Sequence, residues 1–371
     1  MYERCFAEIS LSAIANNARL IRAKTSKNAK VMAVVKADGY GHGAVQVAKT
    51  ALANGADNLA VATVDEGMKL RENNINAPIL TFGFVPESEI PNAIARDIAM
   101  TVYSEVSAAK ISRCAERMDT TARVHIKVDT GMTRLGFSPD SHACELIRRL
   151  PGLDIEGVYT HFAAADEKRL EFTYTQLKLF EEFVERLHII GVNPRIRHCA
   201  NSAGLLRDSV FHMDMVRAGI ILYGLAPSRD VPIRQLGFKP AMSIKSCISM
   251  VKRVNPKIGV SYGRTFITNR ETIIATIPVG YADGYRRVTN KGRVLINGEF
   301  APILGRVCMD QFMVDVTNID GVTAEDEVVL IGKQGEHEIA ADDIAELSGT
   351  INYEVVCGIS KRVPRVYQSR V

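Results

Sequence analysis

The sequence lacks tryptophan altogether, and none of its apolar runs approaches the roughly 18–20 residues that a membrane-spanning helix requires. Without tryptophan, indole rings cannot serve as anchors for stacked bases or for a membrane interface. Lysine and arginine form no basic block, and the formal net charge is only +4. The segment 1–8 has no apolar stretch of the kind found in secretory signals. We therefore expect no signal segment, and neither a nucleic acid nor a membrane as partner.

Cysteine is scarce and irregularly placed. Seven cysteines occur, an odd number, and no two of them have the CxxC spacing. This arrangement favours neither a disulfide framework nor a zinc site. The protein is expected to hold no metal, to keep its thiols reduced and to work in the cytoplasm.

The length of 371 residues exceeds what one small core organises and is typical of two domains. From residue 11 to 236, short apolar runs alternate with helical patterns. The alternation predicts strands at 31–37, 58–64, 78–82, 98–103, 124–128, 155–161, 195–199 and 213–217. Eight strands separated by helices predict an α/β fold, a (β/α)8 barrel of the TIM type. A doubly wound parallel sheet fits the pattern alone as well.

After residue 236 the pattern changes to short β-rich runs punctuated by Gly, Pro and Asn. These runs lie at 244–251, 272–278, 293–296, 311–316 and 327–331. Only 340–347 has the pattern of a helix, with Asp342 and Asp343 in its first turn. We predict a mostly β C-terminal domain at 237–371, which an early strand within residues 1–10 is expected to join.

Lys36 is the most informative residue of the first domain. It follows the apolar run 31–35 and begins the string KADGYGHG, in which residues 39, 41 and 43 are glycine. Low-dielectric surroundings favour the neutral amine of a lysine, which is a nucleophile and a base. The glycines let the backbone turn sharply and approach a ligand closely. Taken alone, the string is better explained by a lysine that reaches solvent above an ordinary turn, and it is the rest of the chain that reverses this preference.

Other unusual residues also fall where loops follow the strands, which is where barrels of this type gather their catalytic groups. They occupy 129–136 after the fifth strand, His161 at the end of the sixth, 201–204 after the seventh and 217–220 after the eighth. The last two loops are the usual phosphate site of such barrels. Lys36 and this site together suggest pyridoxal 5'-phosphate bound as a Schiff base, although sugar phosphates use the same site.

The ordered motifs resemble those of the alanine racemases, which are fold-type III pyridoxal-phosphate enzymes. The resemblance extends over essentially the whole chain, and eight short strings in order make it specific. They are VVKADGYGHG (34–43), KVDTGM (127–132), NSAG (201–204), VRAG (216–219), SYG (261–263), GYADG (280–284), CMD (308–310) and NYE (352–354).

The resemblance implies a racemase that interconverts L-alanine and D-alanine and supplies D-alanine for peptidoglycan. Lys36 would carry the cofactor and act as the base on the D-side. Tyr262 would be the base on the L-side and would reach the site from the partner subunit of a homodimer with shared active sites. Racemisation requires both, because a proton leaves one face of the substrate and returns to the other. Arg217 would face the pyridine nitrogen and keep it unprotonated, while His161 would hydrogen-bond Arg217.

The resemblance also assigns the remaining site residues. The phosphate set is Tyr40, Ser202, Gly219, Ile220 and Tyr353, in which Ser202 offers a hydroxyl and Gly219 and Ile220 offer backbone N–H groups.

Arg134 and the backbone N–H of Met309 would bind the carboxylate of the amino-acid substrate. Lys127 matches a lysine that is carbamylated in many members and orients that arginine. A buried lysine paired with Asp129 is the alternative. Tyr281 and Asp310 match the residues that line the entrance.

Three other functions compete with alanine racemisation. A racemase for serine or for small amino acids in general would use the same scaffold, because one hydroxyl or methylene changes discrimination by only about 1–3 kcal/mol. Tyr353 crowds the side-chain pocket and favours alanine. A non-catalytic pyridoxal-phosphate-binding barrel would lack the β domain and its tyrosine. A decarboxylase of the same fold type would place a carboxylate where this chain offers Arg217.

Overall fold

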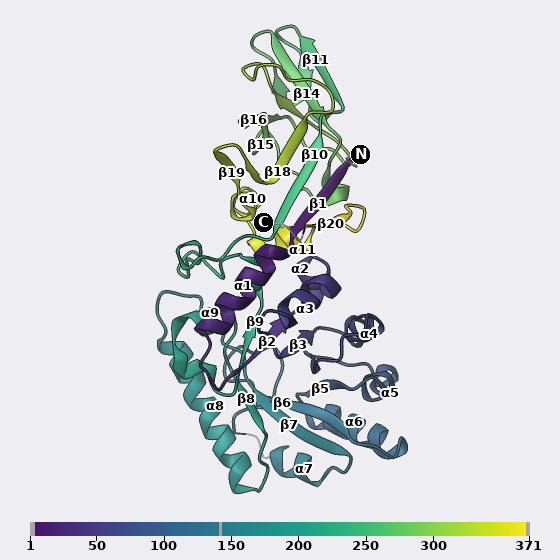
Figure 1. Ribbon diagram of the computed structural model, residues 1–371, viewed down its shortest axis with the longest axis vertical. Coiled ribbons are helices and arrows are strands. Elements are labelled where there is room, and N and C mark those ends of the chain that lie inside the picture. The colour runs from purple at the N-terminus through teal and green to yellow at the C-terminus, as the bar shows by residue number, and fades with distance from the viewer. Residues whose placement is uncertain (1–3, 141–142, 369–371) are drawn as a thin grey trace. The chain divides into compact units, whose positions relative to one another are not determined.

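The structure is a computed structural model that describes residues 4–140 and 143–368 (Figure 1). The described residues form two compact units. We call them the barrel unit, residues Ala13–Gly39 and Gly43–Lys239, and the β unit, residues 4–12, Tyr40–His42 and 240–368. Residues 1–3 and 369–371 lie outside the described residues. Both stretches belong to the predicted second domain, and residues 1–3 also belong to the segment 1–8, in which we expect no signal.

In the described part of the barrel unit, eight parallel strands pair in the order β8-β7-β6-β5-β4-β3-β2-β9. Their bounds are β2 Lys30–Val34, β3 Asn58–Val61, β4 Ile79–Thr81, β5 Ile98–Val102, β6 Ala122–Lys127, β7 Leu153–Tyr159, β8 Ile196–His198 and β9 Met215–Ala218. Backbone hydrogen bonds from Asp214 N–H to Arg197 O and from Arg217 N–H to Ala200 O, each 3.1 Å, join β9 to the β8 segment. The sheet is thus a nearly closed barrel. The predicted TIM-type fold is confirmed, and the doubly wound alternative is wrong.

Helices follow the strands along the chain, and their buried faces explain why they form. The helices are α1 Leu11–Lys24, α3 Ala44–Leu52, α4 Val64–Glu72, α5 Ile90–Ala95, α6 Glu105–Arg117, α7 Ala143–Arg149, α8 Glu171–Ile189 and α9 Ser202–Arg207. In α8, the buried residues Leu177, Phe180, Val184 and Leu187 recur at three- and four-residue spacing. Strands β3 and β5 are buried at every position, as expected for a parallel sheet covered on one face by helices and filled on the other by side chains.

Two strand ends differ from the sequence expectation in a way that matters for the site. Strand β2 ends at Val34 rather than at residue 37, and β7 ends at Tyr159 rather than at residue 161. Lys36 and His161 therefore lie beyond the strands, in the loops at their carboxyl ends. The first shift occurs because Lys36 opens a left-handed turn that a strand cannot contain.

The β unit is built on a sheet with the path β11-β14-β17-β16-β15-β18-β10-β1-β20, to which β19 adds beside β18, and on a two-stranded pair β12-β13. The early strand β1 pairs antiparallel with β10 and parallel with β20. The bounds are β1 Cys5–Ser10, β10 Met242–Cys247, β11 Met250–Val254, β12 Gly259–Val260, β13 Phe266–Ile267, β14 Thr272–Ile277, β15 Arg293–Ile296, β16 Glu299–Leu304, β17 Phe312–Asp315, β18 Glu327–Gln334, β19 His337–Ile339 and β20 Arg365–Gln368.

The run 244–251, predicted as one strand, is two strands. Ile248 N–H donates to Asp326 O at 3.0 Å, whereas Ser249 N–H donates to Thr276 O at 2.9 Å. The chain therefore changes pairing partner between these two residues, and β10 pairs with β18 while β11 pairs with β14. The predicted helix is α10 Ala341–Ser348, which ends at Gly349 with φ 65°. A second helix, α11 Asn352–Cys357, follows it.

Across residues 4–140 and 143–368, no helix combines the length and hydropathy needed to cross a bilayer. Six cysteines are free thiols, namely Cys5, Cys114, Cys199, Cys247, Cys308 and Cys357. The side chain of Cys144 is outside the described part of the structure.

Candidate active site

Lys36 begins a left-handed turn, the segment Lys36–Tyr40 labelled α2 in Figure 1. Ala37, Asp38 and Gly39 have φ of 52°, 51° and 63°, and Tyr40 has φ 51°. Residues other than glycine rarely adopt this conformation, and each such residue costs about 1–3 kcal/mol. Strain of this kind persists only where surrounding contacts hold it in place.

Two carboxylates hold this turn. Glu66 accepts hydrogen bonds from Ala37 N–H and from Ala62 N–H, both at 2.7 Å. Asp38 accepts from Ala44 N–H at 3.2 Å and from Lys69 Nζ at 3.0 Å. The backbone that carries Lys36 is therefore fixed from both sides of the turn.

Arg217 lies on β9 with only 3% of its surface exposed, and every hydrogen bond that it donates goes to a group at the strand ends. Its Nη2 donates to Thr160 O at 2.8 Å, to Cys199 O at 2.9 Å and to His161 Nδ1 at 3.3 Å. Its Nη1 donates to His198 Nδ1 at 3.0 Å. Burial lowers the pKa of Arg217 to about 10, so the guanidinium still carries its charge at neutral pH.

His161 lies among cationic groups. Burial lowers its pKa well below the ordinary value, and Arg217, Arg134, Lys127 and Lys36 lower it further. The imidazole is therefore neutral, and it lies beside the charged guanidinium of Arg217. A group of donors like this suits an anionic ligand. Pyridoxal phosphate fits it, because the phosphate is an anion, the aldehyde reacts with an amine such as that of Lys36, and the ring nitrogen accepts hydrogen bonds.

Lys127 is buried at the end of β6, with its Nζ 5.6 Å from the centre of the Tyr159 ring. Burial lowers its pKa to about 7, Asp129 opposes that shift, and Arg217 and Arg134 add to it. A substantial share of this amine is therefore neutral near pH 7, and the neutral form is a nucleophile.

Arg134 is carried by the tight loop that follows β6. Asp129 Oδ1 accepts from Gly131 N–H at 3.1 Å and from Thr133 N–H at 2.9 Å. At the base of the loop, Asp129 N–H donates to Phe137 O at 2.9 Å. The loop is thus held in one conformation by Asp129 while the Arg134 side chain remains exposed.

The loops after β8 and β9 meet at Ser202 and Gly219. Gly219 N–H donates to Ser202 Oγ at 2.9 Å. Asn201 caps α9 by accepting from Gly204 N–H at 2.9 Å, and this places Ser202 at the start of the helix. Ile220 follows in the 3-10 turn η3 Ile220–Tyr223. The predicted phosphate residues of the barrel unit are therefore neighbours.

In the β unit, Tyr262 is 67% exposed on a strained turn, η5 Tyr262–Arg264. Ser261 has φ 65°, and its hydroxyl donates to Arg306 O at 2.6 Å. Gly305 packs so closely that a Cβ there would lie 2.5 Å from Ser261 Cβ. The turn thus presents the phenol of Tyr262 outward from a rigid base.

The segments that carry Tyr281 and Met309 are bonded to each other. Tyr281 N–H donates to Cys308 O at 3.1 Å, and Ala282 N–H donates to Met309 O at 3.0 Å. A Cβ at Gly280 would lie 2.2 Å from Met309 O, so only glycine permits this contact. Tyr281 is 40% exposed and Met309 53% exposed.

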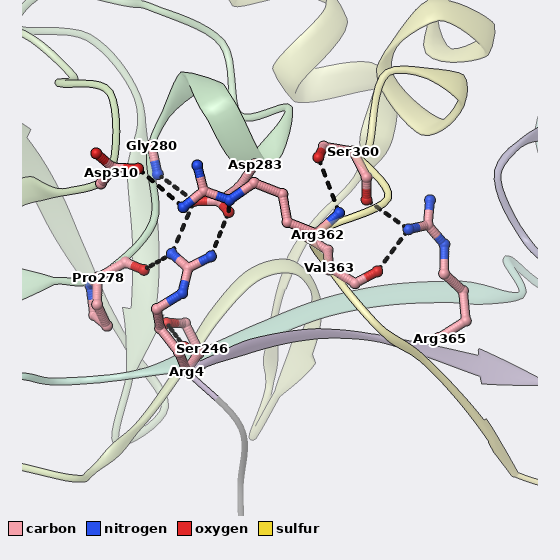
Figure 2. Close-up of polar contacts among 10 residues, drawn as sticks. All are labelled: Arg4, Ser246, Pro278, Gly280, Asp283, Asp310, Ser360, Arg362, Val363 and Arg365. Carbon is pink, nitrogen blue, oxygen red and sulfur yellow. Dashed lines mark hydrogen bonds and ion pairs between the residues drawn. The ribbon is translucent and has the colours of Figure 1, made fainter.

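Asp283, with Arg4 and Arg362 as its side-chain partners, holds the turn that contains Tyr281 (Figure 2). The side chain of Asp283 is 1% exposed and is bonded by Arg4 and by Gly280 N–H. Arg362 Nε lies 3.2 Å from Asp283, and Arg362 Nη2 lies 2.9 Å from Asp310. The predicted entrance residue Asp310 is therefore part of a charged cluster that also supports the Gly280–Asp283 turn.

Tyr40 and Tyr353, both predicted to bind the cofactor phosphate, also lie together in the β unit. Their ring centroids are 6.3 Å apart, and Tyr353 is on α11. The next residue, Gly41, contacts the same helix so closely that a Cβ there would lie 2.3 Å from Val356 O.

The structure groups the predicted site residues in two sets. The barrel unit holds Lys36, Lys127, Arg134, His161, Ser202, Arg217, Gly219 and Ile220, and the β unit holds Tyr40, Tyr262, Tyr281, Met309, Asp310 and Tyr353. Sequence reasoning missed His198, Tyr159 and His125, which surround Arg217 and Lys127 inside the barrel unit. The sequence does indicate one of these three residues. His125 lies two positions before Lys127, so the two side chains share one face of the strand.

Comparison with known proteins identifies the family. Family models match as "Alanine racemase, N-terminal domain" over residues 9–227 and "Alanine racemase, C-terminal domain" over 241–367. The alanine racemase of Methanococcus maripaludis is 47% identical over 365 residues, which covers 98% of each chain. Alanine racemase 1 of Clostridium acetobutylicum is 46% identical over 366 residues, covering 98% of this chain and 95% of its own.

Solved structures agree with this result. The alanine racemase of Clostridium difficile has a TM-score of 0.95 at 42% identity and covers 100% of this chain and 97% of its own. The Bacillus anthracis alanine racemase with bound L-Ala-P has a TM-score of 0.93 at 40% identity and covers 99% of this chain and 96% of its own. The chain therefore belongs to the alanine racemase family of amino-acid racemases.

Proposed function

We propose that this protein interconverts L-alanine and D-alanine with pyridoxal 5'-phosphate as its cofactor. The observation that carries the proposal is the group of basic side chains at the strand ends of the barrel unit, where buried Arg217 lies 3.3 Å from His161. The charges of Arg217, Arg134, Lys127 and Lys36 all lower the pKa of that buried imidazole. The family relationship supports the reaction, and the relative solved with bound L-Ala-P supports alanine as substrate.

The barrel unit would hold the cofactor. Lys36 would bind it through its amine, and Arg217 would donate to its ring nitrogen. Ser202, Gly219 and Ile220 would bind its phosphate, with Tyr40 and Tyr353 completing that set. When bound, the cofactor draws electrons from the substrate's Cα and so makes its proton removable.

The chain's own groups would then move the proton and orient the substrate. Lys36 would take or return the Cα proton on one face, and the phenolic oxygen of Tyr262 would do so on the other. Arg134 and Met309 N–H would bind the carboxylate. Carbamylation of Lys127, which its neutral amine permits, would place a negative charge beside Arg134. Tyr281 and Asp310 would line the entrance.

We further propose a homodimer in which Tyr262 of one subunit serves the barrel of the other. Support comes from the outward presentation of Tyr262, Tyr281 and Met309, three large exposed side chains on connected segments of the β unit. Exposed apolar groups gathered in this way are typical of interaction surfaces. The D-alanine product would serve peptidoglycan synthesis, and the free thiols fit a place in the cytoplasm.

The cofactor assignment is tested by absorption spectroscopy and borohydride reduction of the purified protein, followed by peptide mapping. The proposal predicts a visible absorption band that reduction abolishes, with the label on Lys36. The Lys36→Ala variant is expected to take no label, and Lys49→Ala, which changes an exposed lysine of α3, is expected to label as the wild type does. Label on any other lysine, or no cofactor uptake, would overturn the assignment.

A further inference from the structure

A line of four side chains joins Arg217 to residues of three neighbouring strands of the barrel unit. Arg217 Nη1 lies 3.0 Å from His198 Nδ1, and His198 Nε2 lies 2.9 Å from His125 Nδ1. His125 Nε2 in turn lies 3.5 Å from Glu156 Oε2. The four residues belong to β9, β8, β6 and β7. Strands β8, β7 and β6 are consecutive in the sheet, and backbone hydrogen bonds join β9 to the β8 segment.

With a guanidinium at one end and a carboxylate at the other, only one set of hydrogen-bond directions satisfies the whole line. A guanidinium donates and never accepts, so His198 Nδ1 must be unprotonated. The proton of a neutral His198 is then on Nε2 and is donated to His125 Nδ1. His125 must consequently carry its own proton on Nε2, where the Glu156 carboxylate can accept it.

The protonation states agree with this direction. His125 is 3% exposed and His198 is fully buried. Burial lowers the pKa of both imidazoles, and the charge of Arg217 lowers that of His198 further. The hydrogen bond from His125 lowers the pKa of Glu156, and the charges of Arg123 and Arg195 add to that shift. The line thus joins a cation to an anion through two neutral rings.

Two local features of the barrel accommodate these four side chains, a glycine beside the His125 ring and a shift in strand register. Gly157 faces the His125 ring so closely that a Cβ there would lie 2.3 Å from Nδ1. The pairing of β6 with β7 also shifts register between Val124 and His125. Tyr159 stacks on His198 with centroids 4.8 Å apart and bonds Thr101 Oγ1 through its hydroxyl at 2.9 Å. In the described residues, no group of three or more His, Cys, Asp or Glu side chains is arranged to hold a metal ion.

We propose that Glu156 and His125 are positioning residues for Arg217. Glu156 selects the tautomer of His125, His125 selects the tautomer of His198, and His198 then presents an acceptor that holds the guanidinium in one orientation. Among the described residues, no hydrogen bond or ion pair joins Glu156 or His125 directly to the groups assigned to the cofactor. The effect on catalysis rests on the proposed function, whereas the tautomers are a property of the protein itself.

Nitrogen NMR of the full-length protein labelled with 15N-histidine tests the tautomers, because protonated and unprotonated ring nitrogens have distinct shifts. Removal of His125 or His198 in turn by substitution with Gln assigns their signals. The wild type is expected to show Nε2 protonated and Nδ1 unprotonated on both rings. A proton on Nδ1 of either ring overturns the proposal, and this result needs no Glu156 variant.

Two variants of Glu156 distinguish a role in positioning Arg217 from a role in the folding of the protein. Glu156→Leu removes the acceptor and is expected to mix the tautomers of both rings. We expect it to lower kcat about 10–100-fold, the range seen when the hydrogen-bond partner of a metal-ligating side chain is lost. Glu156→Gln keeps an acceptor oxygen and is expected to restore the wild-type tautomers and most of kcat. Unchanged tautomers in Glu156→Leu would overturn the proposal, as would equal loss of kcat in both variants.

Asp154→Asn is the matched control, because it removes a charge two positions away on the same strand, where Asp154 pairs with Arg195 at 2.7 Å. It is expected to leave both tautomers and kcat unchanged, and a shift in either tautomer would overturn the specific role of Glu156. If the wild type has the expected tautomers but does not racemise alanine, the proposed function fails while the hydrogen-bond line stands.

Discussion

Asp283 accepts hydrogen bonds from both terminal nitrogens of Arg4, from Nη1 at 3.0 Å and from Nη2 at 2.5 Å (Figure 2). The two residues are 279 positions apart in the sequence. Arg4 immediately precedes β1, and Asp283 closes the turn that supports Tyr281 and Met309. The pair therefore links the start of the chain to a predicted part of the active site.

Replacing Asp283 with asparagine is expected to destabilise the protein by about 1.5–3 kcal/mol, because a buried carboxylate loses its charge-assisted hydrogen bonds. Burial opposes its charge, but the hydrogen bonds from Arg4 and Gly280 lower its pKa below the ordinary value. Its contribution is thus present above about pH 4 and is lost as the pH falls through the lowered pKa. Urea unfolding at neutral and acidic pH measures the difference. Asp310→Asn, which removes an exposed partner of Arg362, is the control and should cost less than about 1 kcal/mol.

Lys127 is expected to make the protein more stable as the pH rises above neutral. Burial lowers its folded-state pKa to about 7, whereas an unfolded lysine titrates near 10.4. Between these values the unfolded chain binds more protons, so the free energy of unfolding rises with pH, by at most about 1.4 kcal/mol per pH unit. Lys127→Met should remove this slope. Denaturation in carbon-dioxide-free buffer at about pH 7.5 and 9.5 measures it, and equal slopes in both proteins would contradict the assignment.

Tyr262→Phe is expected to lower racemisation about 10²–10⁴-fold, the range for loss of a general acid or base. Cofactor uptake and the label on Lys36 should be unchanged. Tyr174→Phe is the matched control, since it removes a phenol that bonds Asp208 at 2.7 Å outside the predicted site. Undiminished turnover in Tyr262→Phe would rule out this residue as a base.

Mixing Lys36→Ala subunits with Tyr262→Phe subunits tests whether sites are shared between subunits. Each variant alone is expected to be nearly inactive. A mixed dimer has one site with Lys36 and Tyr262 both intact, so activity should return to about half that of the wild type per mixed dimer. Subunit exchange is followed independently with differently tagged chains. Exchange without recovery would show that each site takes both residues from one chain.

The sequence predicted the fold well because its strands are local apolar runs followed by polar loops. The same reasoning placed Lys36, Arg217 and Ser202 at strand ends, where glycines and polar residues stand out. It could not predict the left-handed turn, because Ala37 has no preference for that conformation and the Glu66 contact that holds its N–H lies 29 positions away.

Features that depend on contacts between distant residues could also not be predicted from the sequence. The line from Arg217 to Glu156 depends on strand neighbours that only the closed barrel defines, and a lone histidine in a strand gives no sign of its partner. The division of 244–251 into two strands likewise depends on Asp326 and Thr276, which lie far along the chain.

The most direct test of the account is incubation of the cofactor-loaded protein with L-alanine in D2O, with chiral separation and mass analysis of the alanine. Racemisation through Lys36 and Tyr262 predicts D-alanine that carries solvent deuterium at Cα, and an approach to equal amounts of the two enantiomers. Alanine that stays in the L form without deuterium, despite a cofactor bound at Lys36, would contradict it.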